Sequence, residues 1–120
     1  MNTQEQINAA IAAHATWKAR LKSAIDKGTS EVTPVAIQVD DRCDFGKWLH
    51  GAAATAFKSS PHYTKCVELH RQFHIVAAKV LSLALGGKKD EAVRFIGLQG
   101  EFTLASAALT KAMMDWKSAG

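Results

Sequence analysis

Residues 60–87, SPHYTKCVELHRQFHIVAAKVLSLALGG, carry the longest continuous pattern in the chain and decide the fold. A serine followed by proline favours a helix start, because serine caps the first turn and proline fits the first helical position. Side chains spaced by three or four then continue until Gly86 and Gly87 break the pattern. This spacing predicts a long helix from Ser60-Pro61 to about Leu85, whose buried stripe is Val67, His70, His74, Ala77, Leu81 and Leu85.

Two further segments show helical spacing on either side of this element. The first is predicted to run from about Thr3 to Lys27 and to end at Gly28, a residue type that commonly follows a helix. The last is predicted to continue without a break along one heptad stripe. The first stripe is Ile7, Ile11, His14, Trp17, Leu21 and Ile25, and the last is Ala92, Phe95, Gln99, Phe102, Ser106, Leu109, Met113 and Trp116.

The region between the first two long helices has a different pattern. Residues 28–40, GTSEVTPVAIQVD, contain β-branched residues and a proline without helical spacing, which predicts an extended crossover loop. Asp40 or Asp41 then caps a short helix, CDFGKWLHG, which Gly51 ends. Residues 52–59 are rich in alanine and can add a helical turn or two. The sequence therefore predicts an all-α, four-helix-bundle-like domain with three long helices, one short cysteine-bearing helix and a long crossover.

Composition limits the class of protein. The chain has 120 residues, which suits one domain covering 1–120, and its 48% hydrophobic content with 22% charged residues is typical of a globular protein. The net charge of +4 is modest and the basic residues are scattered, so we expect no nucleic-acid binding. No stretch approaches the length of a membrane span, and the N-terminus lacks the pattern of a signal peptide. We therefore expect a cytoplasmic protein without membrane contact.

The pair His70 and His74 points to chemistry rather than to packing alone. Residues four apart on a helix lie on the same face, so both imidazoles can reach one ion. Both histidines also lie on the stripe that faces the core. Burying two imidazoles without a common partner costs desolvation twice, which favours a shared ligand.

Two further side chains complete a candidate ligand set. His14 occupies a core-facing position of the first helix, and Cys43 stands near the start of the short helix, where backbone N–H groups favour a thiolate. Three nitrogens and one sulfur form a closed tetrahedral set that suits zinc. The sequence therefore predicts one zinc ion held by His14, Cys43, His70 and His74.

The other cysteine and histidines are interpreted differently, and an enzyme is not expected. Cys66 is predicted to be a small buried core residue, while His50 and His62 are predicted to face solvent. A zinc hydrolase needs an open ligand position and a general base, but Glu68 is predicted to lie on a different helix face from His70. A cysteine–histidine nucleophile would lack an evident oxyanion donor, and a di-iron site would need carboxylates that the stripes do not contain.

Three elements of the chain, in this order, resemble the chemoreceptor zinc-binding (CZB) domain family. Residues 43–48, Cys-Asp-Phe-Gly-Lys-Trp, are similar to the Cys-x-Phe-Gly-x-Trp core of that family. His14 and Trp17 resemble the His-x-x-Trp element that precedes this core. His70 and His74 resemble the helical His-x-x-x-His that follows it. The resemblance covers about residues 7–117.

This resemblance implies a cytoplasmic regulatory module, usually attached to bacterial chemoreceptors or to diguanylate cyclases, that binds zinc tightly through three histidines and one cysteine. Members of the family are typically homodimers. Some respond to zinc, and others respond to oxidants such as hypochlorous acid through the zinc-bound cysteine. We therefore expect a homodimeric sensory module in chemotaxis or cyclic-di-GMP control, with Cys43 as its redox switch. The sequence contains no methyl-accepting coiled coil and no cyclase domain, so its output partner is expected in cis on a longer chain or in trans.

Four residues are expected to pack around the ligands without binding metal. Phe45 and Trp48 give the short helix an apolar edge, and Gly46 permits a close approach to a neighbouring helix. Trp17 lies one turn from His14 and is expected to shield the site from water. A purely structural zinc module that mediates dimerisation would use the same ligands, and it stays an alternative to a sensor.

Overall fold

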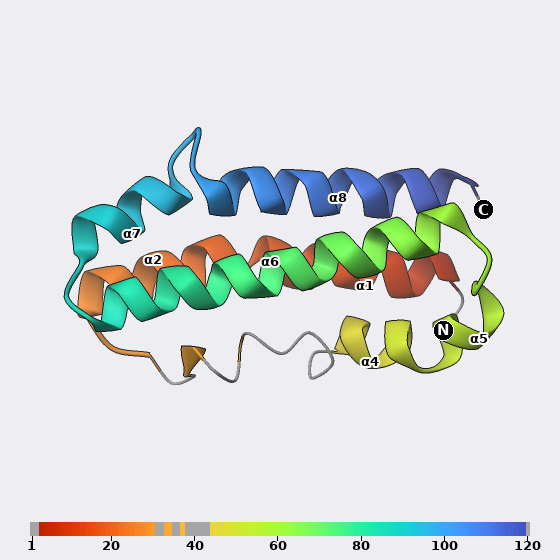
Figure 1. The fold of residues 1–120 in the computed structure, drawn as a ribbon, viewed down its shortest axis with the longest axis horizontal. Coiled ribbons are helices and arrows are strands. Elements are labelled where there is room, and N and C mark those ends of the chain that lie inside the picture. Colours follow the sequence, from red (N-terminus) through yellow and green to blue (C-terminus); the bar gives the residue numbers. More distant parts are fainter. Residues whose placement is uncertain (1–2, 31–32, 35–36, 38–43, 120) are drawn as a thin grey trace.

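The structure of the protein, a computed structural model, describes residues 3–30, 33–34, 37 and 44–119. These residues form an elongated bundle of helices that measures 43 × 25 × 19 Å (Figure 1). No strand occurs among the described residues, which confirms the prediction of an all-α fold. The helices are α1 (Thr3–Ala15), α2 (Trp17–Lys27), α4 (Asp44–His50), α5 (Ala52–Ala56), α6 (Pro61–Leu85), α7 (Lys89–Ile96) and α8 (Glu101–Ala119).

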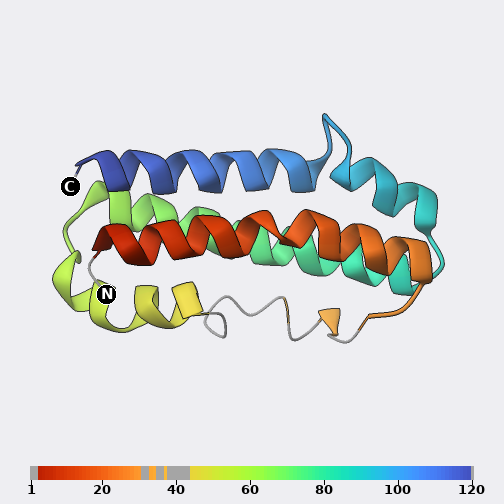
Figure 2. The same cartoon turned by 180° about the vertical axis from the view of Figure 1, so that it is seen from behind.

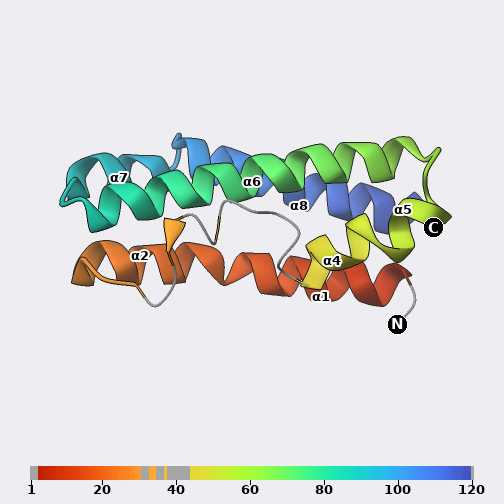
Figure 3. The same ribbon diagram turned by 60° about the horizontal axis from the view of Figure 1, so that its bottom comes forward.

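Helix α6 occupies the centre of the bundle. Helix α8 lies along one of its sides, and the line formed by α1 and α2 lies along another (Figures 1 and 2). The short helix α4 packs beside α1 and near α6, on the side of the bundle away from α8 (Figure 3). This arrangement brings α1, α4 and α6 together in one part of the bundle.

The helix predicted over Thr3–Lys27 is interrupted at one residue. Thr16 separates α1 from α2, although its backbone keeps right-handed helical angles (φ −77°, ψ −16°). Its hydroxyl donates to the carbonyl of Ala13 at 2.7 Å, a local bond that competes with the regular helical pattern. The two helices nevertheless continue in nearly the same direction (Figure 2). Gly28 ends α2 with a left-handed backbone (φ 70°), as its type predicts.

The central helix has the predicted bounds. The Ser60 side chain caps the first turn by accepting from the Tyr63 N–H at 3.4 Å, Pro61 occupies the first helical position, and the helix ends at Leu85. Tyr63 also donates its hydroxyl to the Leu49 carbonyl at 2.8 Å and so ties α4 to α6. The predicted stripe is largely buried, but Leu85 at the helix end is 39% exposed.

The prediction of one unbroken last helix is wrong. Residues 97–100 separate α7 from α8, and Gln99, which was placed on the buried stripe, is exposed. Gly100 explains the break, because a Cβ atom at this position would lie 2.1 Å from the carbonyl oxygen of Phe95. Only glycine permits the chain to turn this tightly against the end of α7. The heptad spacing happens to continue across residues 97–100, so the sequence pattern did not indicate a turn there.

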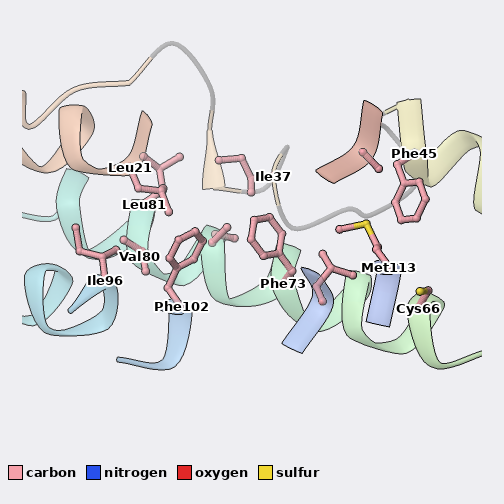
Figure 4. Close-up of a cluster of buried hydrophobic side chains, with 14 of the residues drawn as sticks. Leu21, Ile37, Phe45, Cys66, Phe73, Val80, Leu81, Ile96, Phe102 and Met113 are labelled. Atoms are coloured by element: carbon pink, nitrogen blue, oxygen red, sulfur yellow. The ribbon is translucent and has the colours of Figure 1, made fainter. Parts of the chain in front are cut away.

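The core runs the full length of the bundle (Figure 4). One end of it is purely apolar, and we call Leu21, Val80, Leu81 and Ile96 the apolar cluster; all four are less than 9% exposed. Phe73 and Phe102 follow along α6 and α8, with ring centroids 5.3 Å apart. The other end contains Phe45, Cys66 and Met113 (Figure 4). No helix among the described residues is long and apolar enough to cross a membrane.

Candidate metal centre

Three histidines converge inside this core. His14 comes from α1, and His70 and His74 come from α6, one turn apart. All three are buried, with exposed fractions of 5%, 0% and 3%. We call these residues the histidine cluster. One ring nitrogen from each lies within 4.8 Å of the other two, a spacing at which they can share an ion.

The backbone sets the direction of two of the rings. His14 donates through Nδ1 to the Ala10 carbonyl at 2.7 Å, and His74 donates through Nδ1 to the Ile37 carbonyl at 2.8 Å. Since a carbonyl oxygen can only accept, Nδ1 carries the proton in both rings. In a neutral ring the lone pair then lies on Nε2, the atom that faces the other histidines.

The distances between the Nε2 atoms suit a tetrahedral ion. His70 Nε2 lies 3.2 Å from His14 Nε2 and 3.0 Å from His74 Nε2. Zinc–nitrogen bonds of about 2.0–2.1 Å in tetrahedral geometry place two ligand nitrogens about 3.3 Å apart. These two distances are close to the spacing that a single zinc ion requires, and the residues present fit the metal.

Burial keeps the rings in the form that binds metal. Desolvation lowers the pKa of His14 from 6.5 to about 4, against the raising effect of its bond to Ala10 and with a smaller lowering by His74. Desolvation also lowers the pKa of His70 to about 2, assisted by His74 and His14. Near neutral pH both rings are thus uncharged, as metal ligands must be.

Aromatic rings surround the histidine cluster. The ring centroid of Phe45 lies 5.2 Å from that of His70 and 6.0 Å from that of His14. Phe73, which is fully buried, packs against His14 at 5.1 Å and against His74 at 5.7 Å. These apolar walls exclude water and so lower the local dielectric around the nitrogens. Phe45 was predicted in this position, whereas Phe73 was missed.

The other residues predicted around the site occupy different positions. Trp48 stacks on Phe45 at 5.8 Å and on Trp116 of α8 at 5.4 Å, so it stands one layer further from the histidines. Gly46 is buried in α4. Trp17 is half-buried and has the Arg20 guanidinium over its ring at 4.0 Å. It lines a cavity beside Leu81, and no ring contact between Trp17 and the histidine cluster is found among the described residues.

Cys43, the predicted sulfur ligand, lies outside the described residues, as do Asp40 and Asp41. The helix that follows it begins at Asp44. Cys66 is fully buried on α6, as predicted, and it is not among the groups that converge.

The remaining candidates do not reach the histidine cluster. His50 is exposed, as predicted, whereas His62, which was also predicted to face solvent, is half-buried in the first turn of α6. Glu68 is exposed and pairs with Arg71 at 2.7 Å, so it turns away from His70 as the helical pattern predicted.

Two backbone carbonyls belong to the site and could not be found by side-chain pattern. Ala10 stands four residues before His14, so its bond is local to α1. Ile37 stands 37 residues before His74, in the crossover between α2 and α4. The sequence around Ile37 contains several other apolar residues, so it does not single out this carbonyl.

These features define a class of protein: a helical bundle domain whose interior presents convergent imidazoles to a transition metal. The family model named chemoreceptor zinc-binding domain (CZB) matches residues 14–81, more than half of the chain, and the chain belongs to this family. The match spans all four predicted ligands. The family is a zinc-binding signalling domain and not a family of enzymes. No curated protein and no solved structure matches the chain.

Proposed function

We propose that this chain is a zinc-binding sensory module in which His14, His70, His74 and Cys43 hold one zinc ion and Cys43 acts as the switch. The observation that carries the proposal is the convergence of three Nε2 atoms, with neighbouring distances of 3.2 and 3.0 Å, inside an apolar core. Membership of a zinc-binding family supports zinc as the metal. The bound ion would neutralise the cysteine thiolate and join α1 to α6.

Chain connectivity supports Cys43 as the fourth ligand. Only Asp44 separates it from Phe45, whose ring contacts both His14 and His70. Two peptide steps span at most about 7 Å, so the cysteine is tethered close to the histidine cluster. The donor set of three imidazoles and one thiolate is typical of closed zinc sites.

The four ligands do not share equal support from the fold. His70 and His74 stand on the longest helix, and His14 stands on α1 with its ring direction fixed within that helix. Cys43 instead precedes α4, a helix of 7 residues that docks through Phe45 and Trp48. We infer that loss of the sulfur ligand frees α4 first, while the imidazoles keep a partial hold on the metal.

Two stimuli would act on this ligand. A fall in zinc empties the site and lets the Cys43 thiolate take up a proton. Hypochlorous acid oxidises the thiolate by two electrons, which yields a sulfenic acid and chloride, and a sulfenic acid is a poorer ligand. In both cases the signal is a change in how α4 packs on the bundle. The output would be a chemoreceptor or a diguanylate cyclase, in cis or in trans, acting in chemotaxis or cyclic-di-GMP control.

Several further properties belong to the same proposal. We infer that residues 1–120 form a single regulatory domain, that it acts as a homodimer in the cytoplasm, and that it has no catalytic activity of its own. The structural alternative is a zinc module that only stabilises the bundle or a dimer. It is favoured by the position of the histidine cluster, which links α1 to α6 within the core.

Metal analysis of the full chain, purified without added metal, tests the ligand set. We expect one zinc per chain in the wild-type protein and a loss of more than half of it in His14→Ala. His62→Ala is the matched control, because His62 stands on α6 but away from the histidine cluster, and it should keep full occupancy. A wild-type chain that contains no zinc and takes up none would overturn the proposal.

Chelator competition before and after mild hypochlorite tests the switch. The wild-type protein should release zinc more readily after oxidation, and Cys43→Ala should keep some metal but show no response. Cys66→Ala, the control, should respond like the wild type. A wild-type protein that holds zinc unchanged after oxidation, and whose affinity is far tighter than cytosolic free zinc, would identify the structural alternative.

A further inference from the structure

The crossover between α2 and α4 reaches the histidine cluster at one described residue, Ile37. Its carbonyl oxygen accepts the hydrogen bond from His74 Nδ1 at 2.8 Å. Its side chain is 5% exposed and borders the same cavity as Leu21 and Leu81. Figure 4 shows this side chain directed into the core above Phe73. A single residue thus contacts both the core and the metal site.

The partner of His74 differs in kind from the partner of His14. The Ala10 carbonyl lies in the same helix as His14, so the ring of His14 keeps its direction whenever α1 is folded. The Ile37 carbonyl belongs to a segment that is distant in sequence, and its place depends on the packing of that segment. The Ile37 N–H donates to the Thr33 carbonyl at 3.2 Å, within the same segment, whereas the Ile37 side chain is buried in the core.

The direction of the His74 ring decides which nitrogen is offered to the metal. A ring that donates through Nδ1 presents the Nε2 lone pair toward His70, 3.0 Å away. Without an acceptor on the other side, the proton can sit on either nitrogen and the ring can turn. Partners of this kind typically change metal affinity by about 10–100-fold when they are lost.

We propose that Ile37 is a positioning residue of the metal site, whose buried side chain holds its own carbonyl in place to orient His74. This inference rests on the proposed function and adds a regulatory consequence to it. Docking of the crossover and binding of zinc stabilise each other, because each favours the same position of Ile37. A partner or modification that draws the crossover from the core would therefore weaken zinc binding without touching a ligand.

Zinc titration of the full-length Ile37→Ala variant, in competition with a chelator, tests the proposal against a matched control. Ile25→Ala removes an equally buried isoleucine (4% exposed) from α2, away from the histidine cluster. We expect Ile37→Ala to weaken zinc binding at least about tenfold, and Ile25→Ala to change it less than about twofold. Ile37→Val, which keeps most of the buried surface, should bind within about threefold of the wild type.

Nitrogen NMR of the metal-free protein measures which ring nitrogen of His74 carries the proton. A loss of packing alone would not change this tautomer. His74 should carry its proton on Nδ1 in the wild type and in Ile25→Ala, and should become a mixture of tautomers in Ile37→Ala. If Ile37→Ala does not fold, Ile37→Val and Ile37→Thr, compared in the same assay, replace it, and the threonine variant should show the mixed tautomer.

The results separate this inference from the proposed function. A wild-type chain that binds zinc, together with an Ile37→Ala variant of equal affinity and unchanged tautomer, overturns the role of Ile37 and leaves the zinc site intact. A wild-type chain that binds no zinc overturns the proposed function, and the tautomer measurement then still decides whether Ile37 orients His74.

Discussion

The histidine cluster and the apolar cluster each include residues of α6, on which His70 and Leu81 are about 16 Å apart, and the two clusters contribute to the fold in different ways. The apolar side chains of Leu81 and Leu21 gain free energy by leaving water. The buried imidazoles gain less, because their polar nitrogens lose solvation and must find partners within the core. The apolar cluster therefore stabilises the fold through its buried side chains alone, whereas the stability of the histidine cluster depends on what its nitrogens bind.

This contrast predicts that metal removal has the largest effect and that the effect is local. At free zinc a thousand times above the dissociation constant, chelation should lower the free energy of unfolding by about 4 kcal/mol. Hydrogen exchange should increase around His14 and His70 and stay nearly unchanged around Leu81. Thermal denaturation and exchange with and without chelator measure both quantities. A uniform rise in exchange along α6 would contradict the division into two regions.

A crossed pair of variants gives the next largest effect. Leu81→Ala should destabilise the metal-free protein by about 2–5 kcal/mol, since it opens a cavity in the apolar cluster, yet it should still bind one zinc. His70→Ala should lose more than about a hundredfold in zinc affinity, with a smaller change in metal-free stability because it removes a buried polar ring. Denaturant unfolding and zinc titration of both proteins make the comparison. Equal losses of affinity would show that the two regions are not separable.

The turn between α7 and α8, which follows Ile96 of the apolar cluster, provides a third test of the comparison. Gly100→Ala should cost about 1–3 kcal/mol of stability, because its Cβ would lie 2.1 Å from the Phe95 carbonyl oxygen and 2.3 Å from that of Arg94. Gly97→Ala is the control in the same turn, where the nearest backbone atom is 3.5 Å away and no strain is expected. Both variants should bind zinc with wild-type affinity, as a titration would show.

The smallest effect concerns Cys66, one turn from His70 on the same helix. Burial, with a lesser contribution from Asp115, raises the pKa of the Cys66 thiol from 9.0 to about 12. The folded protein therefore keeps a proton that the unfolded chain loses above about pH 9, so the free energy of unfolding falls as the pH rises from about 9 toward 12. At pH 8 iodoacetamide should leave Cys66 unmodified in the native protein and modify it in urea, as intact mass would show. Rapid native alkylation at Cys66 would disprove this.

Those features of the fold that depend on local chemistry could be predicted from the sequence. The bounds of α6 follow from Ser60-Pro61 and the paired glycines after Leu85. The convergence of the three histidines follows from helical spacing, because a ring on a buried stripe has no other direction available. The aromatic wall at Phe45 could be predicted for the same reason.

The missed features depend on backbone atoms and on tertiary packing. The break at Gly100 was hidden because apolar spacing alone does not show that a carbonyl occupies the space of a Cβ atom. The role of Ile37 depends on its carbonyl, an atom that every residue type carries, so no side-chain pattern reports it. Phe73 was missed because it lies off the predicted stripe of α6, and its contacts with His14 and His74 depend on how the helices pack.

The stacked pair Trp48 and Trp116 gives the molecule a built-in optical label. Trp48 stacks on Phe45, which contacts the imidazoles, and on the indole of Trp116 near the end of α8, and Phe57 contacts both indoles. Trp17 lies apart under the Arg20 guanidinium. Intrinsic fluorescence therefore has two separate sources, and a shift in the emission of the stacked pair alone would follow the departure of α4 in real time without any added dye.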